Sequence, residues 1–92
     1  MRFISAKYVS LRNEKRFVDV SDIFNILIKN KCGNLEEEIT DSLLQCDPHH
    51  GSYKKLVIIY EENKEQKVKE VNQNEILMII FPNQFDCIVL FI

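Results

Sequence analysis

Leu56-Val57-Ile58-Ile59-Tyr60 is a nearly continuous apolar run, and it decides how the rest of the chain is interpreted. A strand with apolar residues on both faces is typical of the centre of a sheet. Residues 61–66 follow as a polar turn, and residues 67–71 return as a partly exposed strand. The run therefore predicts a sheet built around residues 56–60, with a hairpin on its C-terminal side.

Further strands are predicted on both sides of this hairpin. Residues 3–11 alternate in the manner of a half-buried strand, and residues 16–20 can pair back on them. Residues 76–81 and 86–92 are two more apolar strands, joined by a turn at Pro82-Asn83-Gln84. We predict an α+β domain with an antiparallel or mixed sheet of four to six strands and one or two short helices.

The clearest helix signal covers residues 22–31. Ser21 is a good N-cap, because its hydroxyl can accept a hydrogen bond from a backbone N–H of the first turn. The positive end of the helix dipole stabilises the negative charge of Asp22 in the first turn. Gly33 is a residue type that commonly ends a helix at its C-terminus.

Residues 34–46 allow two interpretations. Leu35, Ile39 and Leu43 recur at every fourth position, and Asn34 could cap a helix whose first turn holds three glutamates. The same segment begins with the alternation of a short, half-exposed strand. Local chemistry favours the helix, and the alternative stays open.

Length and composition predict one folded domain. The 92 residues fit a single domain, and 46% hydrophobic with 28% charged residues is ordinary for a globular protein. Twelve basic and fourteen acidic residues give a net charge of −2, with both signs scattered along the chain. Nucleic-acid binding needs clustered Lys or Arg, so no nucleic-acid partner is expected.

No membrane span is expected either. The longest apolar stretch, residues 76–92, is interrupted at Pro82, whereas a helical span needs about 20 apolar residues. The N-terminal apolar run is too short for a signal peptide. Without an export signal, Cys32, Cys46 and Cys87 are interpreted as reduced thiols of a cytoplasmic protein.

Several short motifs carry a resemblance over residues 3–80. They are Ile4-Ser5-Ala6-Lys7-Tyr8, Val18-Asp19-Val20-Ser21, Asp47-Pro48-His49-His50-Gly51, Lys55-Leu56-Val57-Ile58-Ile59-Tyr60 and Glu75-Ile76-Leu77-Met78-Ile79. In this order they resemble the C-terminal domain of DnaJ-type co-chaperones of the subfamily C member eleven kind, a domain also found as small stand-alone proteins. Val9 departs from that family, which usually has glycine after the first tyrosine. The resemblance implies an assembly or interaction role without assigned catalysis, and a strand at residues 35–40.

One cluster has the character of a metal site. Cys46, His49 and His50 offer sulfur and nitrogen donors, and Cys32 or Cys87 could complete the four that zinc takes. A solvated turn with Cys46 packed inward explains the same residues without metal. A metal-stabilised binding module is therefore an alternative, and no cofactor is expected.

Catalysis is not expected. A cysteine–histidine pair needs an orienting third group and an oxyanion hole, and no motif marks either one. We predict a non-enzymatic module that binds another protein or itself, with a small protein inhibitor as a further alternative.

Two segments are predicted to make its contacts. The first is a loop, residues 45–53, shaped by the Asp47 side chain accepting a backbone N–H two residues on; its binding residues are Asp47, Pro48, His49, His50 and Gly51. The second is an exposed edge strand at the C-terminus, with Ile88, Leu90 and Ile92, which would also support a homo-oligomer.

Overall fold

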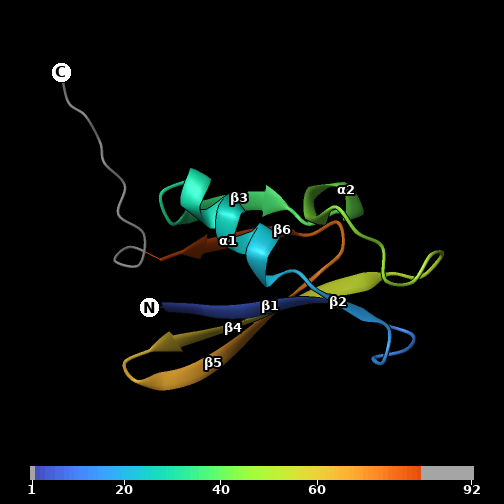
Figure 1. The fold of residues 1–92 in the computed structure, drawn as a ribbon, viewed down its shortest axis with the longest axis horizontal. Helices are drawn as coiled ribbons and strands as arrows, with labels where there is room; N and C mark the ends of the chain where they lie inside the picture. Colours follow the sequence, from blue (N-terminus) through green and yellow to red (C-terminus); the bar gives the residue numbers. More distant parts are fainter. Residues whose placement is uncertain (1, 82–92) are drawn as a thin grey trace.

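The computed structural model describes residues 2–81. The elements, in chain order, are β1 (Arg2–Ser10), β2 (Phe17–Asp19), α1 (Ser21–Asn30), β3 (Asn34–Glu38), α2 (Asp41–Leu44), β4 (Lys54–Glu62), β5 (Glu65–Asn72) and β6 (Ile76–Ile80). The strands form two antiparallel sheets, one ordered β2-β1-β4-β5 and the other β3-β6. Figure 1 shows the four-stranded sheet on one side of the molecule, with both helices and the β3-β6 pair on the other. The α+β prediction is confirmed in outline, but the six strands are divided between two sheets.

The central position predicted for residues 56–60 is confirmed. β4 lies between β1 and β5, and its inward residues Leu56 and Ile58 are fully buried. The turn to β5 has positive φ at both Asn63 and Lys64, as the tight hairpins that match strand twist require.

Helix α1 is confirmed within a residue at each end, but the predicted cap is wrong. Ser21 is the first helical residue, and the residue before it makes no side-chain cap. The Ser21 hydroxyl instead accepts from the Ala6 N–H at 3.0 Å and donates to the Ala6 carbonyl at 3.3 Å. Ser21 therefore ties the start of α1 to β1, while Phe24 and Ile28 enter the core.

The helix favoured for residues 34–46 is wrong for most of that segment. β3 occupies its first five residues and pairs with β6, so Leu35 is buried opposite Ile79 while Glu36 and Glu38 face solvent. Pairing across the sheet outweighs the local helix preference of consecutive glutamates. The strand that the resemblance implies is confirmed at residues 34–38. A helix follows only at α2, where the Thr40 hydroxyl accepts from the Leu43 N–H.

The core fills the space between the two sheets and α1. Phe3 contacts Phe24 and Phe81, with ring centroids 5.1 and 6.1 Å apart, and Phe81 also contacts Tyr60 at 6.4 Å. Because Phe81 directly follows β6, these rings hold the small sheet over the large one.

The predicted strand at residues 76–81 is confirmed as β6. The predicted turn at residues 82–84 and the edge strand with Ile88, Leu90 and Ile92 lie outside the described residues. Neither helix in the described part has the length and hydrophobicity that a membrane crossing needs.

Candidate functional site

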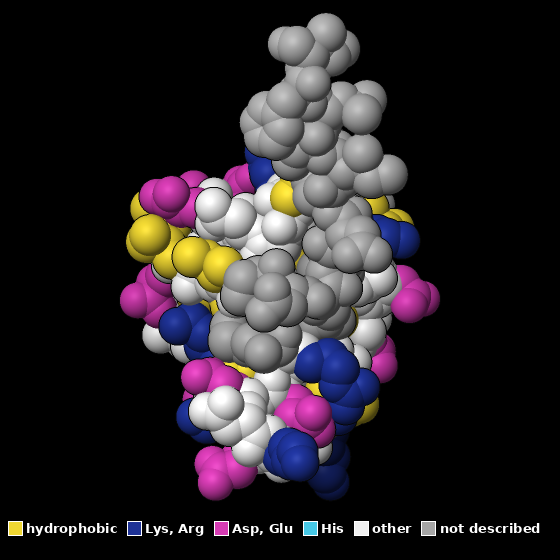
Figure 2. Space-filling model, turned by 90° about the vertical axis from the view of Figure 1, so that its left-hand side faces the viewer, with side chains coloured by type: hydrophobic (Ala, Val, Ile, Leu, Met, Phe, Trp, Pro, Cys, Tyr) yellow, Lys and Arg dark blue, Asp and Glu magenta, His cyan; other side chains and the backbone are white. Residues whose placement is uncertain are grey.

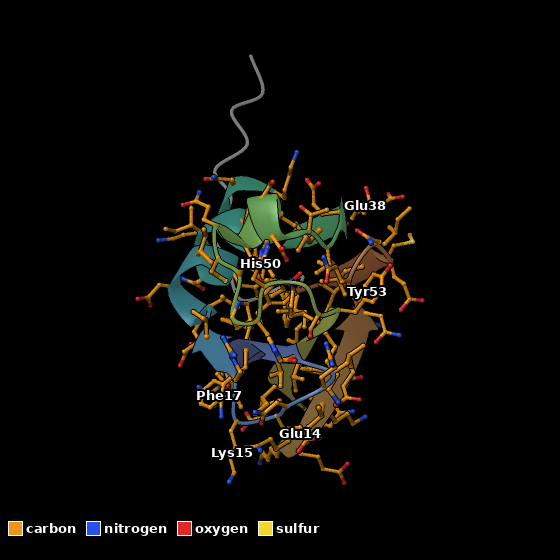
Figure 3. All side chains as sticks on the ribbon, turned by 90° about the vertical axis from the view of Figure 1, so that its right-hand side faces the viewer. Glu14, Lys15, Phe17, Glu38, His50 and Tyr53 are labelled. Carbon is orange, nitrogen blue, oxygen red and sulfur yellow. The ribbon has the colours of Figure 1, made fainter. Side chains whose placement is uncertain are left out.

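The loop of residues 45–53 connects α2 to β4 at one end of the molecule. Figure 3 views this end, with His50 and Tyr53 in front and the β1–β2 connection at Glu14 and Lys15 below them. Asp47 Oδ1 accepts from the His49 N–H at 3.2 Å, which is the predicted loop-shaping contact. The Asp47 side chain therefore makes a hydrogen bond within the loop itself.

A polar cluster anchors this loop to the sheet; it consists of the buried Tyr8 and Lys54 and the partly exposed Asp41 and Asp47. The Lys54 ammonium is 2.8 Å from Asp47 Oδ1 and 3.1 Å from Asp41 Oδ2, and its side chain is only 3% exposed. The Tyr8 hydroxyl donates to Asp41 Oδ1 at 2.7 Å. The cluster therefore joins β1, α2, the loop and β4 through side chains alone.

The sequence analysis does not single out Lys54 as a site residue, although the alternation of the predicted strand places it on the buried face. Residues two apart in a strand share a face, so Lys54 points to the same side as the buried Leu56 and Ile58. A buried ammonium needs a carboxylate partner. Asp41 and Asp47 are the acidic residues nearest in sequence on the N-terminal side of Lys54.

The contacts of the cluster favour the ordinary protonation states of Lys54, Asp47 and Tyr8. Burial lowers the pKa of Lys54, but the hydrogen bonds to Asp47 and Asp41 outweigh it and raise that pKa. The hydrogen bond from Lys54 lowers the pKa of Asp47. Burial, and then Asp41, raises the pKa of both Tyr8 and Cys46. Ammonium at Lys54, carboxylate at Asp47, phenol at Tyr8 and thiol at Cys46 are therefore the forms favoured at neutral pH.

His49 connects the loop to the β1–β2 connection. Its Nδ1 is 2.7 Å from the Ser10 hydroxyl, which already accepts from the backbone N–H groups of Arg12 and Asn13. The hydroxyl therefore donates its single hydrogen to Nδ1, and this requires a neutral imidazole. Burial, followed by the positive charges of Arg16 and Arg12, lowers the pKa of His49 and favours the same neutral form.

Cys46, His49 and His50, the described residues of the alternative metal site, have different surroundings. No three His, Cys, Asp or Glu side chains within residues 2–81 are placed to hold a metal ion. Cys46 packs against the core, His49 bonds Ser10, and the His50 side chain is fully exposed, with its Nδ1 3.4 Å from Asp47. Cys46 is a free thiol, but Cys32 is disulfide-bonded, so the expectation of reduced thiols is wrong for Cys32.

A cavity of about 340 Å³ opens beside the cluster. Its walls are Asp41, Asp47, His50, Gly51, Ser52, Tyr53, Lys54 and Gln73. The Ser52 hydroxyl is, among the described residues, the one buried side-chain polar atom without a hydrogen-bond partner. Leaving such a group unpaired costs about 1–3 kcal/mol.

The second candidate surface is the edge of β6. Two hydrogen bonds flank the β3–β6 pair, from Ile39 N–H to Glu75 O and from Phe81 N–H to Gly33 O. They establish which residues of β6 direct their backbone N–H and C=O groups toward β3. Because antiparallel residues alternate, the backbone groups of Ile76, Met78 and Ile80 point away from β3. No described residue pairs with β6 on that side. We call it the β6 edge.

The same three residues expose their side chains. Ile76 and Met78 are each 64% exposed and Ile80 is 54% exposed. Figure 2, which faces the end of the molecule where β6 finishes, shows hydrophobic side chains at the surface beside acidic ones. The β6 edge therefore combines backbone groups that no strand of residues 2–81 pairs with and an apolar stripe.

Two hollows border the β6 edge, and Met78 and Lys69 of β5 line both. One, of about 280 Å³, lies near the β5–β6 turn and includes Val71 and Ile76. The other, of about 370 Å³, lies toward the end of β6 and reaches Leu35 and Tyr60. Space is thus present between the facing edges of β5 and β6.

The chain matches no family model, no curated protein and no solved structure.

Proposed function

We propose that this protein is a non-enzymatic protein-interaction module that adds an extended segment of its partner to the β6 edge. The observation that supports this most is the coincidence, at Ile76, Met78 and Ile80, of outward backbone groups and exposed apolar side chains. In strand addition the backbone bonds supply affinity, and alternate side chains supply specificity.

The other sheet edges of the described residues are protected in ways that β6 is not. β2 has only three residues, and β5 carries Lys67, Lys69 and Glu70. The outward residues of β3 include two glutamates. Short or charged edges discourage pairing with other chains. The sequence of β6, Ile-Leu-Met-Ile-Ile, has no such residue, so it is the edge best suited to accept a strand.

The partner is another protein or a second copy of this chain. Two β6 strands can pair antiparallel around Met78 without bringing like charges together, because the strand is uncharged. The resemblance to the co-chaperone C-terminal domain supports an assembly role, and membership of that family is part of the proposal. The predicted loop contact at residues 47–51 is retained as the flank of the interface.

The chemistry of the polar cluster supports a module without catalysis. A catalytic group is usually tuned toward a pKa near the working pH. Here Lys54 is stabilised as the ammonium and Tyr8 as the phenol. We therefore assign the cluster to holding the loop in place.

Proline substitution tests the β6 edge directly. Met78→Pro removes an N–H that points away from β3, so the β3–β6 bonds remain while the edge loses a donor. Val68→Pro is the matched control, because its N–H points away from β4 and its side chain is 58% exposed. Each folded variant and the wild type is used to capture proteins from native extract and is sedimented over a concentration series.

If a strand adds to the β6 edge, Met78→Pro should no longer capture the partner or self-associate. Val68→Pro should bind and associate like the wild type. A single partner at fixed stoichiometry would favour the inhibitor class. Equal binding by Met78→Pro and the wild type would exclude the β6 edge.

A further inference from the structure

Cys32 takes part in a bond that neither the polar cluster nor the β6 edge explains. It lies in the turn between α1 and β3, with φ of +56°, and its backbone N–H is bonded to the Lys29 carbonyl at 3.1 Å. Cys32 is disulfide-bonded, whereas Cys46 is a free thiol. The sequence holds one further cysteine, Cys87, which lies outside the described residues. Elimination therefore leaves Cys87 as the partner of Cys32.

Phe81, the last described residue, lies beside this turn. Its N–H donates to the Gly33 carbonyl at 2.6 Å, and a Cβ added to Gly33 would run into the Phe81 carbonyl oxygen. Gly33 follows Cys32 directly, and Cys87 is six residues beyond Phe81. Six residues span up to about 20 Å, so a bond between the two cysteines is within reach without moving any described strand or helix.

The same bond excludes the hairpin predicted for the C-terminus. In that hairpin Cys87 would lie opposite Ile79, on the β6 edge. Gly33 is opposite Phe81 on the β3 side, so Cys87 would be about 7 Å along β6 and about 10 Å across it from Gly33. Cys32 is about 3.8 Å from Gly33 and would therefore be at least about 8 Å from Cys87. Disulfide-bonded cysteines have Cα atoms only about 4.4–6.8 Å apart, so the bond and the hairpin cannot coexist.

Residues 86–92 suit the β6 edge once they are released from this bond. They carry one charge, Asp86, and are otherwise apolar. The side chains that the edge exposes, those of Ile76, Met78 and Ile80, are apolar as well. Apolar pairs across neighbouring strands stabilise a sheet.

We propose that Cys32 and Cys87 form a disulfide within one chain, and that this bond keeps residues 86–92 off the β6 edge. The oxidised chain, which is the form that the structure describes, then presents the edge to a partner. In the reduced chain, residues 86–92 pair with the edge and cover it. The control of partner binding rests on the proposed function, whereas the bond itself does not.

The switch requires only thiol–disulfide exchange. A dithiol reductant transfers two electrons and two protons to the bond, so Cys32 and Cys87 become thiols while the two sulfurs of the reductant join in a disulfide. Oxidised glutathione reverses the change, because it accepts two electrons and two protons and leaves as two thiols.

Alkylation tests the bond. The chain is equilibrated with oxidised glutathione, unfolded, treated with N-ethylmaleimide and weighed by mass spectrometry. Labelling is expected at Cys46 alone, on a monomer, and at all three cysteines after prior reduction. Proteolysis should release one peptide pair that links Cys32 to Cys87. A bond that includes Cys46, a bond between two copies, or labelling of all three cysteines before reduction would overturn the proposal.

Amide hydrogen exchange tests the switch, in the oxidised chain and after reduction with dithiothreitol. Reduction should slow exchange at Ile76, Met78 and Ile80 about tenfold or more, because exposed N–H groups gain partners. It should also weaken capture of the partner. Cys46→Ser, which retains the bond, is the control and should exchange like the wild type in both states.

Leu90→Pro separates covering of the edge from a general effect of reduction. Proline has no N–H to donate to a neighbouring strand, so the reduced variant should exchange rapidly at the β6 edge. Exchange that reduction leaves unchanged in the wild type, or equal protection in reduced Leu90→Pro, would overturn the switch. Neither result bears on strand addition by a partner, which Met78→Pro and Val68→Pro test separately in the oxidised chain.

Discussion

At the scale of single residues, the organising feature is a lysine that lies at the start of a central strand. The Lys54 side chain is 3% exposed, whereas its partners Asp41 and Asp47 are 35% and 30% exposed. Removing the ammonium would leave partly solvated carboxylates, but removing a carboxylate would leave buried donors short of an acceptor. The energetic cost of a substitution therefore depends on which partner is lost.

The Tyr8–Asp41 hydrogen bond shows this asymmetry most clearly. Tyr8→Phe removes the hydroxyl and leaves a carboxylate that water can reach, so we expect a loss of about 1 kcal/mol in the free energy of unfolding. Asp41→Ala leaves a fully buried phenol unpaired and takes one acceptor from Lys54, so we expect a loss of about 3 kcal/mol. Urea unfolding measures both, with the exposed Glu14→Ala as control. Equal losses would contradict the asymmetry.

His49 predicts a dependence of stability on pH. Its pKa is lowered in the folded state, so the unfolded chain takes up the proton more readily. Stability is then fully present above the unfolded pKa of about 6.5 and falls as the pH drops through that value toward the folded pKa. Urea midpoints between pH 7.5 and 5 should show this decline in the wild type.

The neighbouring histidine is the control for that measurement. His49→Gln should lose the decline, whereas His50→Gln should keep it, because the His50 side chain is fully exposed. A decline that persists in His49→Gln would assign it to other groups.

At the scale of elements, the sequence predicts the strands better than the helix boundaries or caps. Apolar runs identify β1, β4 and β6, because their alternation or continuity is a local property. Ser21 is a residue type that favours an N-cap, yet it bonds Ala6, fifteen residues earlier, which no local pattern encodes. β3 was obscured by three glutamates, and only its register with β6 makes it a strand.

The two glycines give a matched prediction about the β3–β6 strand pair. Both Gly33 and Gly51 have φ of +82°, so an alanine at either position is strained by about 1 kcal/mol. At Gly51 the added Cβ meets nothing, but at Gly33 it runs into the carbonyl oxygen of Phe81. We expect Gly33→Ala to cost at least about 1 kcal/mol more than Gly51→Ala, since the clash adds to the strain. Urea unfolding of the two variants measures the difference, and equal costs would contradict it.

At the scale of the whole molecule, the division into two sheets was not predictable from the sequence. It depends on β3 pairing with β6 some 40 residues later, and on Phe81 contacting Phe3 and Tyr60. The polar cluster is equally non-local, because it joins Tyr8 to residues of α2, the loop and β4. Asp47 and its turn residues predict the loop, whereas its anchor, Lys54, stands in the sequence as one charged residue at the start of an apolar strand.

The same arrangement leaves the edges of β5 and β6 close at one end and apart at the other. Asn72 and Glu75 are bonded to each other across the short turn, through the Asn72 N–H to Glu75 Oε1 and the Glu75 N–H to Asn72 O. The larger hollow lies toward the other end, where Tyr60 and Ile80 line it. An added strand would therefore enter from the Ile80 end of β6.

Amide hydrogen exchange along β6 tests the central claim most directly, measured in the dilute chain and again in the complex with the captured partner or at associating concentration. Strand addition predicts that Leu77 and Ile79, bonded to β3, are protected throughout. It predicts that Ile76, Met78 and Ile80 exchange rapidly in the dilute chain and become protected in the complex. Rapid exchange at these three amides in both states, or protection already present in the dilute chain, would contradict the account.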